Sequence, residues 1–159
     1  MNLSEMLMLG DPRLYERSTE LIREDVPDIR KWAQGLDGII LQFRQKYGAG
    51  RAVAAPQMGI FKRLVCVHID GPVVMINPVL TGKSEEMFEL WDDCMCFPNL
   101  LVKVKRHRSC TLYFRDLEWK EHQWQLQDDL SELLQHEVDH LDGILAIQRA
   151  VDEKAFKWR

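Results

Sequence analysis

The spacing of apolar residues predicts two amphipathic helices, and the first covers residues 27–47. Apolar side chains recur there three or four positions apart: Ile29, Trp32, Ala33, Leu36, Ile40 and Phe43. That repeat places them on one face of a helix. Pro27 suits the first turn, and Gly48 suits the position just after the last turn.

The second helix is predicted over residues 129–142. Asp128 or Asp129 can cap its start, and Glu132 stands three residues after Asp129, as in a capping box. Gly143 suits the left-handed residue that closes a helix.

Short apolar runs between the two helices predict β-strands. The runs, rich in Val, Leu and aromatic residues, are 63–69, 73–76, 87–91, 101–104 and 110–114. Turn-forming pairs separate several of them: Gly71-Pro72, Asn77-Pro78, Thr81-Gly82 and Pro98-Asn99. Because strands do not alternate regularly with helices, the pattern favours an α+β fold over a parallel βαβ sheet.

The composition fits one globular domain over residues 1–159, with 46% hydrophobic and 29% charged residues. A net charge of −4 argues against a broad electrostatic grip on nucleic acid, and the one basic run, residues 103–108, is expected to be a solvated strand and turn. No segment reaches the roughly 20 apolar residues of a membrane span, and no targeting peptide is visible. The four unevenly spaced cysteines favour a reducing compartment, so we expect a cytoplasmic protein.

The second helix carries the candidate chemistry. His136, Glu137 and His140 form an H-E-x-x-H sequence, whose two histidines share one side of a helix and can reach a single metal ion. With Leu130 set at 0° and about 100° per residue, Glu137 falls at about 340°, inside the apolar stripe, and the histidines fall at its edge. A buried carboxylate needs a compensating cation, and burial raises its pKa toward that of a general base. Asp139, at about 180°, is expected to face solvent.

This helix predicts a mononuclear metal hydrolase, and such a site needs a third protein ligand. Asp142, Asp152 and Glu153 are available downstream. Asp142 faces away from the histidines, and Glu153 lies closer to His140 than the helical ligand of thermolysin-like enzymes does. Cys94 is the upstream alternative.

Three motifs in order resemble those of the peptide deformylases, G-x-G-L-A-A-x-Q, E-G-C-L-S and Q-H-E-x-D-H. The matching segments here are GRAVAAPQ at residues 50–57, DDCMC at 92–96 and QHEVDH at 135–140. LGDPRL and INP, which precede the second motif, are also similar, so the resemblance spans about residues 8–147. It implies an α+β fold with small antiparallel sheets packed around the central H-E-x-x-H helix and with the N-terminal helix covering the sheet.

The resemblance implies Cys94, His136 and His140 as metal ligands. Family members typically hold one divalent ion, Fe(II) in the cell, with zinc, nickel or cobalt as substitutes. Thiolate and imidazole donors suit all of these ions. Glu137 would then be the base that takes a proton from the activated water.

By the same resemblance, the reaction removes the formyl group from formyl-methionine of newly made polypeptides and releases formate. The Gln57 side chain and the backbone N–H of Met95 would form an oxyanion hole. The residues expected to bind substrate are Gly50, Arg51, Ala52, Val53, Asp93 and Leu133. Asp92 and Arg106 are expected to form a structural ion pair. The implied partners are N-formylated nascent peptides and the ribosome, with no membrane contact and no specific nucleic-acid binding.

The sequence departs from the family pattern around the expected mouth of the cleft. Ala52 and Asp93 stand where the family has glycines, Arg51 where many members have an apolar residue, and Cys96 where they have a serine. We hypothesise that Arg51 and Asp93 pair across this mouth. Residues 150–158 leave room for only a stub of the C-terminal helix that many members carry.

These departures leave two alternatives open. An amidase acting on another small N-acyl substrate would keep the metal site and change the mouth. A non-catalytic metal-binding module would not need Glu137 and Gln57, so their presence favours an enzyme.

Overall fold

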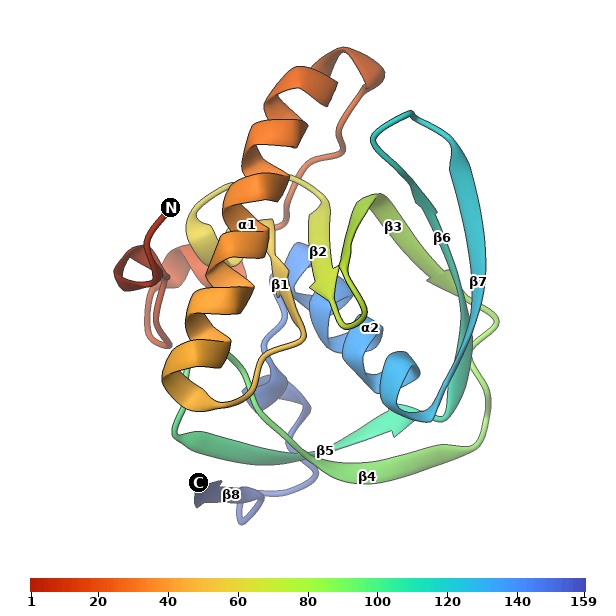
Figure 1. The fold of residues 1–159 in the computed structure, drawn as a ribbon. Coiled ribbons are helices and arrows are strands. Elements are labelled where there is room, and N and C mark those ends of the chain that lie inside the picture. The colour runs from red at the N-terminus through yellow and green to blue at the C-terminus, as the bar shows by residue number, and fades with distance from the viewer.

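The computed structural model describes residues 1–159 and places helix α2 between two antiparallel sheets (Figure 1). The larger sheet has the strand order β1 (Ala52–Ala54), β2 (Leu64–His68), β3 (Pro72–Thr81), β6 (Ser109–Arg115) and β7 (Glu121–Gln127). The smaller sheet has the order β4 (Met87–Asp92), β5 (Leu100–His107) and β8 (Phe156–Trp158). The α-helices are α1 (Val26–Tyr47) and α2 (Asp128–Leu141). Short 3-10 turns are Leu3–Glu5, Pro12–Tyr15, Arg23–Asp25, Ala55–Met58 and Ala146–Arg149.

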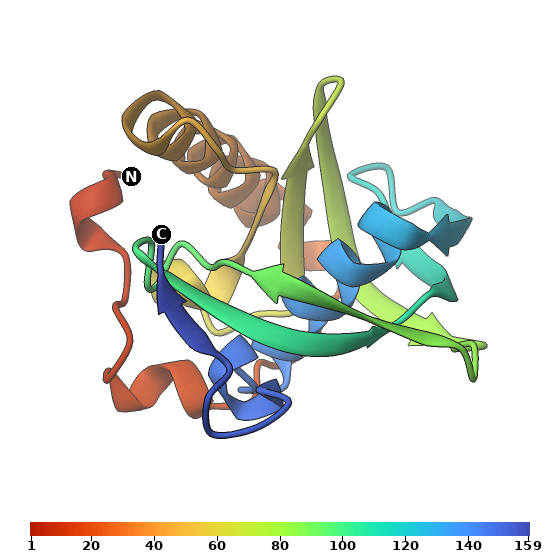
Figure 2. The same cartoon turned by 90° about the horizontal axis from the view of Figure 1, so that it is seen from below.

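The predicted α+β class and its central helix are confirmed. Both helices begin and end within one residue of the predicted limits. Seen from below, α2 runs between the smaller sheet and the β2–β3 hairpin, while α1 lies outside β1 and β2 (Figure 2). Neither α-helix combines the length and the apolar run that a bilayer crossing requires.

Three strands were not predicted. β1 and β8 have only three residues each, and β7 carries polar side chains at most of its positions, so none gives a clear apolar signal. The helical stub expected over residues 150–158 is wrong: the chain turns there and β8 pairs with β5, with Phe156 opposite Val102.

The predicted capping box of α2 is also wrong. Gln127 occupies the cap position and makes no side-chain cap hydrogen bond. Asp128 takes a positive φ of 50° where β7 turns into the helix, and its carboxylate lies 2.7 Å from Arg108. Glu132 turns instead toward the loop before β1, where it meets Arg51.

The alternation of side chains along β1 divides the core in two. Val53 belongs to a cluster of 23 buried residues that includes the inner face of α1. Ala52 and Ala54 point the other way, into a cluster of 12 buried residues between the larger sheet and α2. Because these alanines are small, the H-E-x-x-H helix lies close against the strand.

Gly143 ends α2 with a φ of +72°, as predicted. A β-carbon added there would lie 2.3 Å from the backbone oxygen of Tyr15, in the segment that crosses the end of the helix. Glycine is therefore required at this position both for its backbone angle and for close approach.

We expect Gly143→Ala to destabilise the protein far more than Gly48→Ala. Gly48 has nearly the same φ, +73°, but nothing within 4 Å of an added β-carbon. Its replacement should cost only the left-handed strain of about 1–2 kcal/mol, whereas Gly143→Ala adds a steric term of about 1–3 kcal/mol. Urea unfolding of both variants measures the difference. Equal losses of unfolding free energy would contradict the close approach to Tyr15.

Candidate metal centre and cleft

Three potential metal-donor atoms meet at the buried side of α2. Helix α2 supplies His136 and His140, and the turn after β4 supplies Cys94. The Nε2 atoms of the histidines are 3.2 Å apart, and the Cys94 sulfur lies 3.4 Å from His140 Nε2. All three donor atoms lie within 4.8 Å of one another, and all three residues are buried.

The chemistry of this cluster fits a cation. Burial raises the pKa of the Cys94 thiol well above its usual value. Burial and then the charge of His136 lower the pKa of His140 well below its usual value. Burial thus disfavours the charged form of both groups, and a bound cation would compensate the charge of a Cys94 thiolate while the neutral His140 ring offers its lone pair.

Asp92 fixes which nitrogen of His136 faces the cluster. Its Oδ2 lies 2.9 Å from His136 Nδ1 and 3.1 Å from Arg106 Nη2. Burial alone would raise the pKa of Asp92, but His136 and Arg106 outweigh it and lower that pKa to about 2. Since the ionised carboxylate accepts the Nδ1 proton, Nε2 is the nitrogen that faces the cluster and would bind a metal once that metal displaces its proton.

The contacts of Asp92 with His136 and Arg106 begin a row of ion pairs that continues to the surface. Arg106 Nη1 lies 2.7 Å from Asp139 Oδ2, and Arg149 contacts both oxygens of Asp139 at 2.7 and 2.9 Å. The expectation that Asp139 faces open solvent is therefore wrong. Helical angle alone could not show that a β5 arginine reaches this side of α2.

Glu137 lies inside the protein, as the apolar stripe predicted. Its Oε2 atom is buried and has no hydrogen-bond partner. Burial is the main cause that raises its pKa to about 7. The residue lines the cleft together with Cys94 and His136, so an unpartnered carboxylate oxygen lies beside the donor cluster.

Two further hydrogen-bonding groups surround the cluster. The Gln57 side-chain oxygen accepts from the Ala54 N–H at 2.9 Å, which turns the amide nitrogen toward Cys96 Sγ at 3.3 Å and Cys94 Sγ at 3.6 Å. The Met95 N–H follows directly on Cys94 and donates to no backbone or side-chain acceptor. Both groups are available to an oxygen atom bound in the cleft.

The cleft has a volume of about 460 Å³. Most of the residues expected to bind substrate line it: Gly50, Arg51, Ala52, Asp93 and Leu133. Val53 does not, because the alternation of β1 turns its side chain into the cluster under α1. His140 and Arg106 lie behind the lining, within or next to the donor cluster.

The hypothesised pair between Arg51 and Asp93 is wrong. Arg51 Nη2 lies 2.7 Å from Glu132 Oε1, and Asp93 pairs with Arg159. The Arg51 side chain is 41% exposed and that of Glu132 only 7%. The mouth of the cleft thus carries a half-buried ion pair that reaches across to α2.

The sequence reasoning missed three residues around the site: Arg44, Glu132 and Arg149. A signal for Glu132 was present, because it precedes His136 by four residues, as His136 precedes His140. The other two gave none. Arg44 donates to the backbone oxygens of Gly50 and His68, at 2.9 and 2.6 Å, and so holds the cleft loop against β2.

Comparison with known proteins identifies relatives along nearly the whole chain. A family model described as polypeptide deformylase matches residues 3–156. The peptide deformylase of Dictyoglomus thermophilum is 31% identical over 152 residues, 95% of each chain. That of Rhizobium meliloti is 33% identical and covers 92% of this chain and 84% of its own. Among solved structures, a Plasmodium falciparum peptide deformylase in complex with an inhibitor has a TM-score of 0.83 at 26% identity, over 92% of this chain and 89% of that one. The Thermotoga maritima peptide deformylase has a TM-score of 0.81 at 26% identity, over 92% and 97%.

We expect a double-mutant cycle to find the coupling of Arg51 with Glu132 rather than with Asp93. Arg51→Met and Glu132→Gln, alone and together, should give a coupling free energy of about 1 kcal/mol, since one partner is nearly buried. The cycle of Arg51→Met with Asp93→Asn is the matched control and should give a smaller value. Unfolding in urea at low salt measures both. A larger coupling with Asp93 would contradict the observed pairing.

Proposed function

The chain belongs to the peptide deformylase family, and we propose that Cys94, His136 and His140 hold its metal ion while Glu137 moves the protons. Members of this family are metal-dependent hydrolases that remove the formyl group from nascent polypeptides, and that is the function of this protein. The residue assignment depends mainly on one observation. Three buried donor atoms lie within 4.8 Å of one another, beside a carboxylate oxygen that has no partner.

The ion, when bound, supplies Lewis acidity for the attacking water and for the formyl oxygen. Glu137 takes a proton from that water, and a pKa raised to about 7 suits a group that must accept a proton and later return it. The same carboxyl group then delivers the proton to the departing amine nitrogen. Asp92 holds the His136 ring in place throughout, because its carboxylate accepts the Nδ1 proton.

The oxyanion that forms at the formyl oxygen needs donors already in position. The Gln57 amide nitrogen points toward Cys94, and its carbonyl is fixed by Ala54. The free Met95 N–H adds a second donor. Both donors are thus in position before the reaction, and neither needs a large side-chain movement.

Fe(II) is the ion we propose for the cell, with zinc, nickel or cobalt able to replace it. One thiolate and two imidazoles form a donor set that suits each of these ions. We further propose a cytoplasmic site of action at or near the ribosome, because nascent chains are the substrate. The two rival readings from the sequence, another N-acyl substrate or a non-catalytic module, are not favoured by the relatives.

We expect Glu137→Gln to lower formate release from formyl-Met-Ala peptides by about 10²–10⁴-fold in kcat, the usual contribution of a general acid–base group. Metal content should not change, because Glu137 is not one of the three donors. Glu153→Gln is the matched control, since Glu153 was one of the downstream ligand candidates and is exposed. Activity of Glu137→Gln equal to that of the parent protein would remove Glu137 from the mechanism.

We expect Cys94→Ala to lose most of the bound metal, whereas Cys66→Ala keeps it. Both cysteines are buried, but Cys66 belongs to β2, faces α1 and is not part of the donor cluster. Elemental analysis of protein purified without oxygen measures the content. Chelation should also lower the melting temperature of the parent and of Cys66→Ala but not of Cys94→Ala, because a bound ion stabilises only the folded state. Full metal content in Cys94→Ala would exclude the proposed ligand set.

A further inference from the structure

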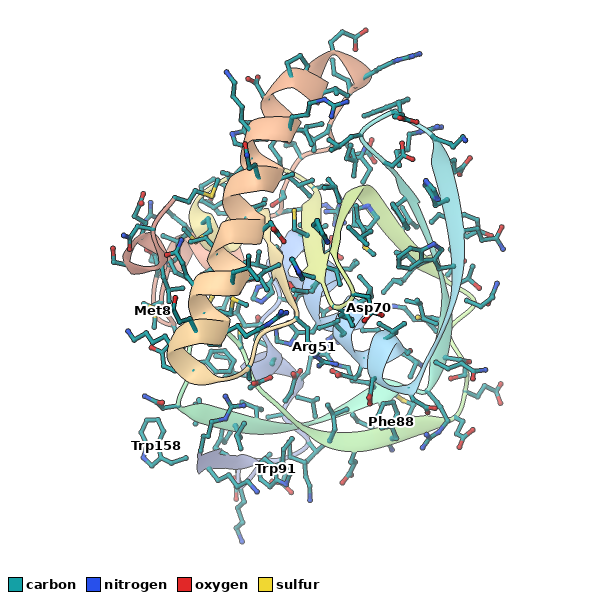
Figure 3. All side chains as sticks on the ribbon, in the orientation of Figure 1. Met8, Arg51, Asp70, Phe88, Trp91 and Trp158 are labelled. Atoms are coloured by element: carbon teal, nitrogen blue, oxygen red, sulfur yellow. The ribbon has the colours of Figure 1, made fainter.

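Cys96 is fully buried behind the cleft wall. It does not line the cleft, although Cys94, two residues earlier, does. On its outer side lies a separate surface hollow whose walls include Met8 and Trp158. Figure 3 shows these two residues at one side of the molecule, apart from Arg51 at the mouth of the cleft. A substrate in the cleft therefore cannot touch Cys96, and any role of its sulfur in the reaction must pass through another residue.

That other residue is Gln57, whose side-chain amide is held at both ends. Its Oε1 accepts the N–H of Ala54 at 2.9 Å, and its Nε2 donates to Cys96 Sγ at 3.3 Å. An amide nitrogen carries two hydrogens, so one goes to Cys96 and the second remains. Gln57 lines the cleft, and its Nε2 lies 3.6 Å from Cys94 Sγ. The second hydrogen is thus left for an oxygen atom bound beside the donor cluster.

Backbone contacts fix the place of the Cys96 sulfur relative to Gln57. The N–H of Leu7 donates to the backbone oxygen of Gln57, and the N–H of Leu9 donates to that of Cys96, both at 2.9 Å. One short N-terminal segment therefore ties the two loops together. The N–H of Cys96 also lies 3.5 Å from Cys94 Sγ. The sulfur is held by the main chain on both sides, so it is a rigid acceptor.

The two sulfurs compete for the same amide. If the Cys96 sulfur were absent, Cys94 Sγ would be the one remaining acceptor near Gln57 Nε2. A buried N–H without an acceptor costs free energy, so the amide would turn toward Cys94. Its hydrogens would then point at the sulfur of a metal ligand instead of at the substrate.

We propose that Cys96 is a positioning residue for deformylation. Its sulfur accepts one amide hydrogen of Gln57, so that the other hydrogen points at the formyl oxygen on which negative charge develops. This inference rests on the proposed function and adds to it a residue that touches neither substrate nor metal ion. A serine hydroxyl offers an acceptor at nearly the same place, whereas alanine offers none.

The first test measures kcat and KM for formate release from formyl-Met-Ala peptides. We expect Cys96→Ala to lower kcat by about 10²-fold, the effect of a group misplaced by about 1 Å. KM should change little, because the sulfur makes no contact with substrate. Cys96→Ser should keep most of the parent kcat. Cys96→Val, which also lacks an acceptor, replaces the alanine variant if that variant does not fold. Cys66→Ala is the matched control, since Cys66 is a buried cysteine outside the site, and it should keep the parent kcat.

A second test asks whether Cys96 acts through Gln57. In a Gln57→Ala background, Cys96→Ala should lower kcat no further, because the amide that it positions is gone. A purely structural role would lower kcat by the same factor in both backgrounds. Nuclear magnetic resonance of the zinc-loaded protein gives a readout without catalysis. The side-chain amide proton signals of Gln57 should move in Cys96→Ala and stay in place in Cys66→Ala.

The outcomes separate this inference from the proposed function. No formate release by the fully loaded parent protein would overturn the proposed function itself. An active parent with an unchanged kcat in Cys96→Ala, or with equal losses in the two backgrounds, would overturn the positioning role and leave the deformylase function in place.

Discussion

The structure depends on holding a carboxylate and two imidazoles inside an apolar helix–sheet interface. Burying such groups costs free energy unless each has a polar partner. Here each imidazole has a partner of its own. His136 leans on Asp92, His140 faces the Cys94 sulfur, and only Glu137 keeps an oxygen with no partner. Glu137 lines the cleft, so this unpartnered oxygen lies at its wall, beside the donor cluster.

Both sheets pack against α2 and together fix the position of this helix. The alanines of β1 let α2 approach closely, and β4 and the turn after it bring Asp92 and Cys94 to the same point from the opposite side. Strands from two sheets and one helix thus fix the positions of the donor atoms. The small residues of the first motif thus have a structural reason in this packing.

Periodicity and motif order predicted most of this arrangement. Both α-helices and the burial of Glu137 follow from residue types at fixed spacing, whereas the place of Cys94 beside the two histidines was expected only from the resemblance to the family motifs. The wrong expectations for Arg51 and Asp139 share a physical origin, because both concern charged side chains whose partners come from remote segments. Arg51 could reach either Asp93 or Glu132, and sequence contains no distance between them. Likewise Asp139 looks solvated on a helical wheel until β5 places Arg106 beside it. The short strand β8 gives too few residues for any periodic signal.

The alternating row of His136, Asp92, Arg106, Asp139 and Arg149 restricts how this sequence can evolve. Each inner member compensates the charges on both sides of it, so a single replacement leaves a neighbour buried and unpaired. We therefore expect substitutions at these positions to occur together rather than one at a time. The surface arginine at the end of the row is the exception, because solvent can replace its contact. Arg149 should therefore tolerate substitution most readily, and His136 least.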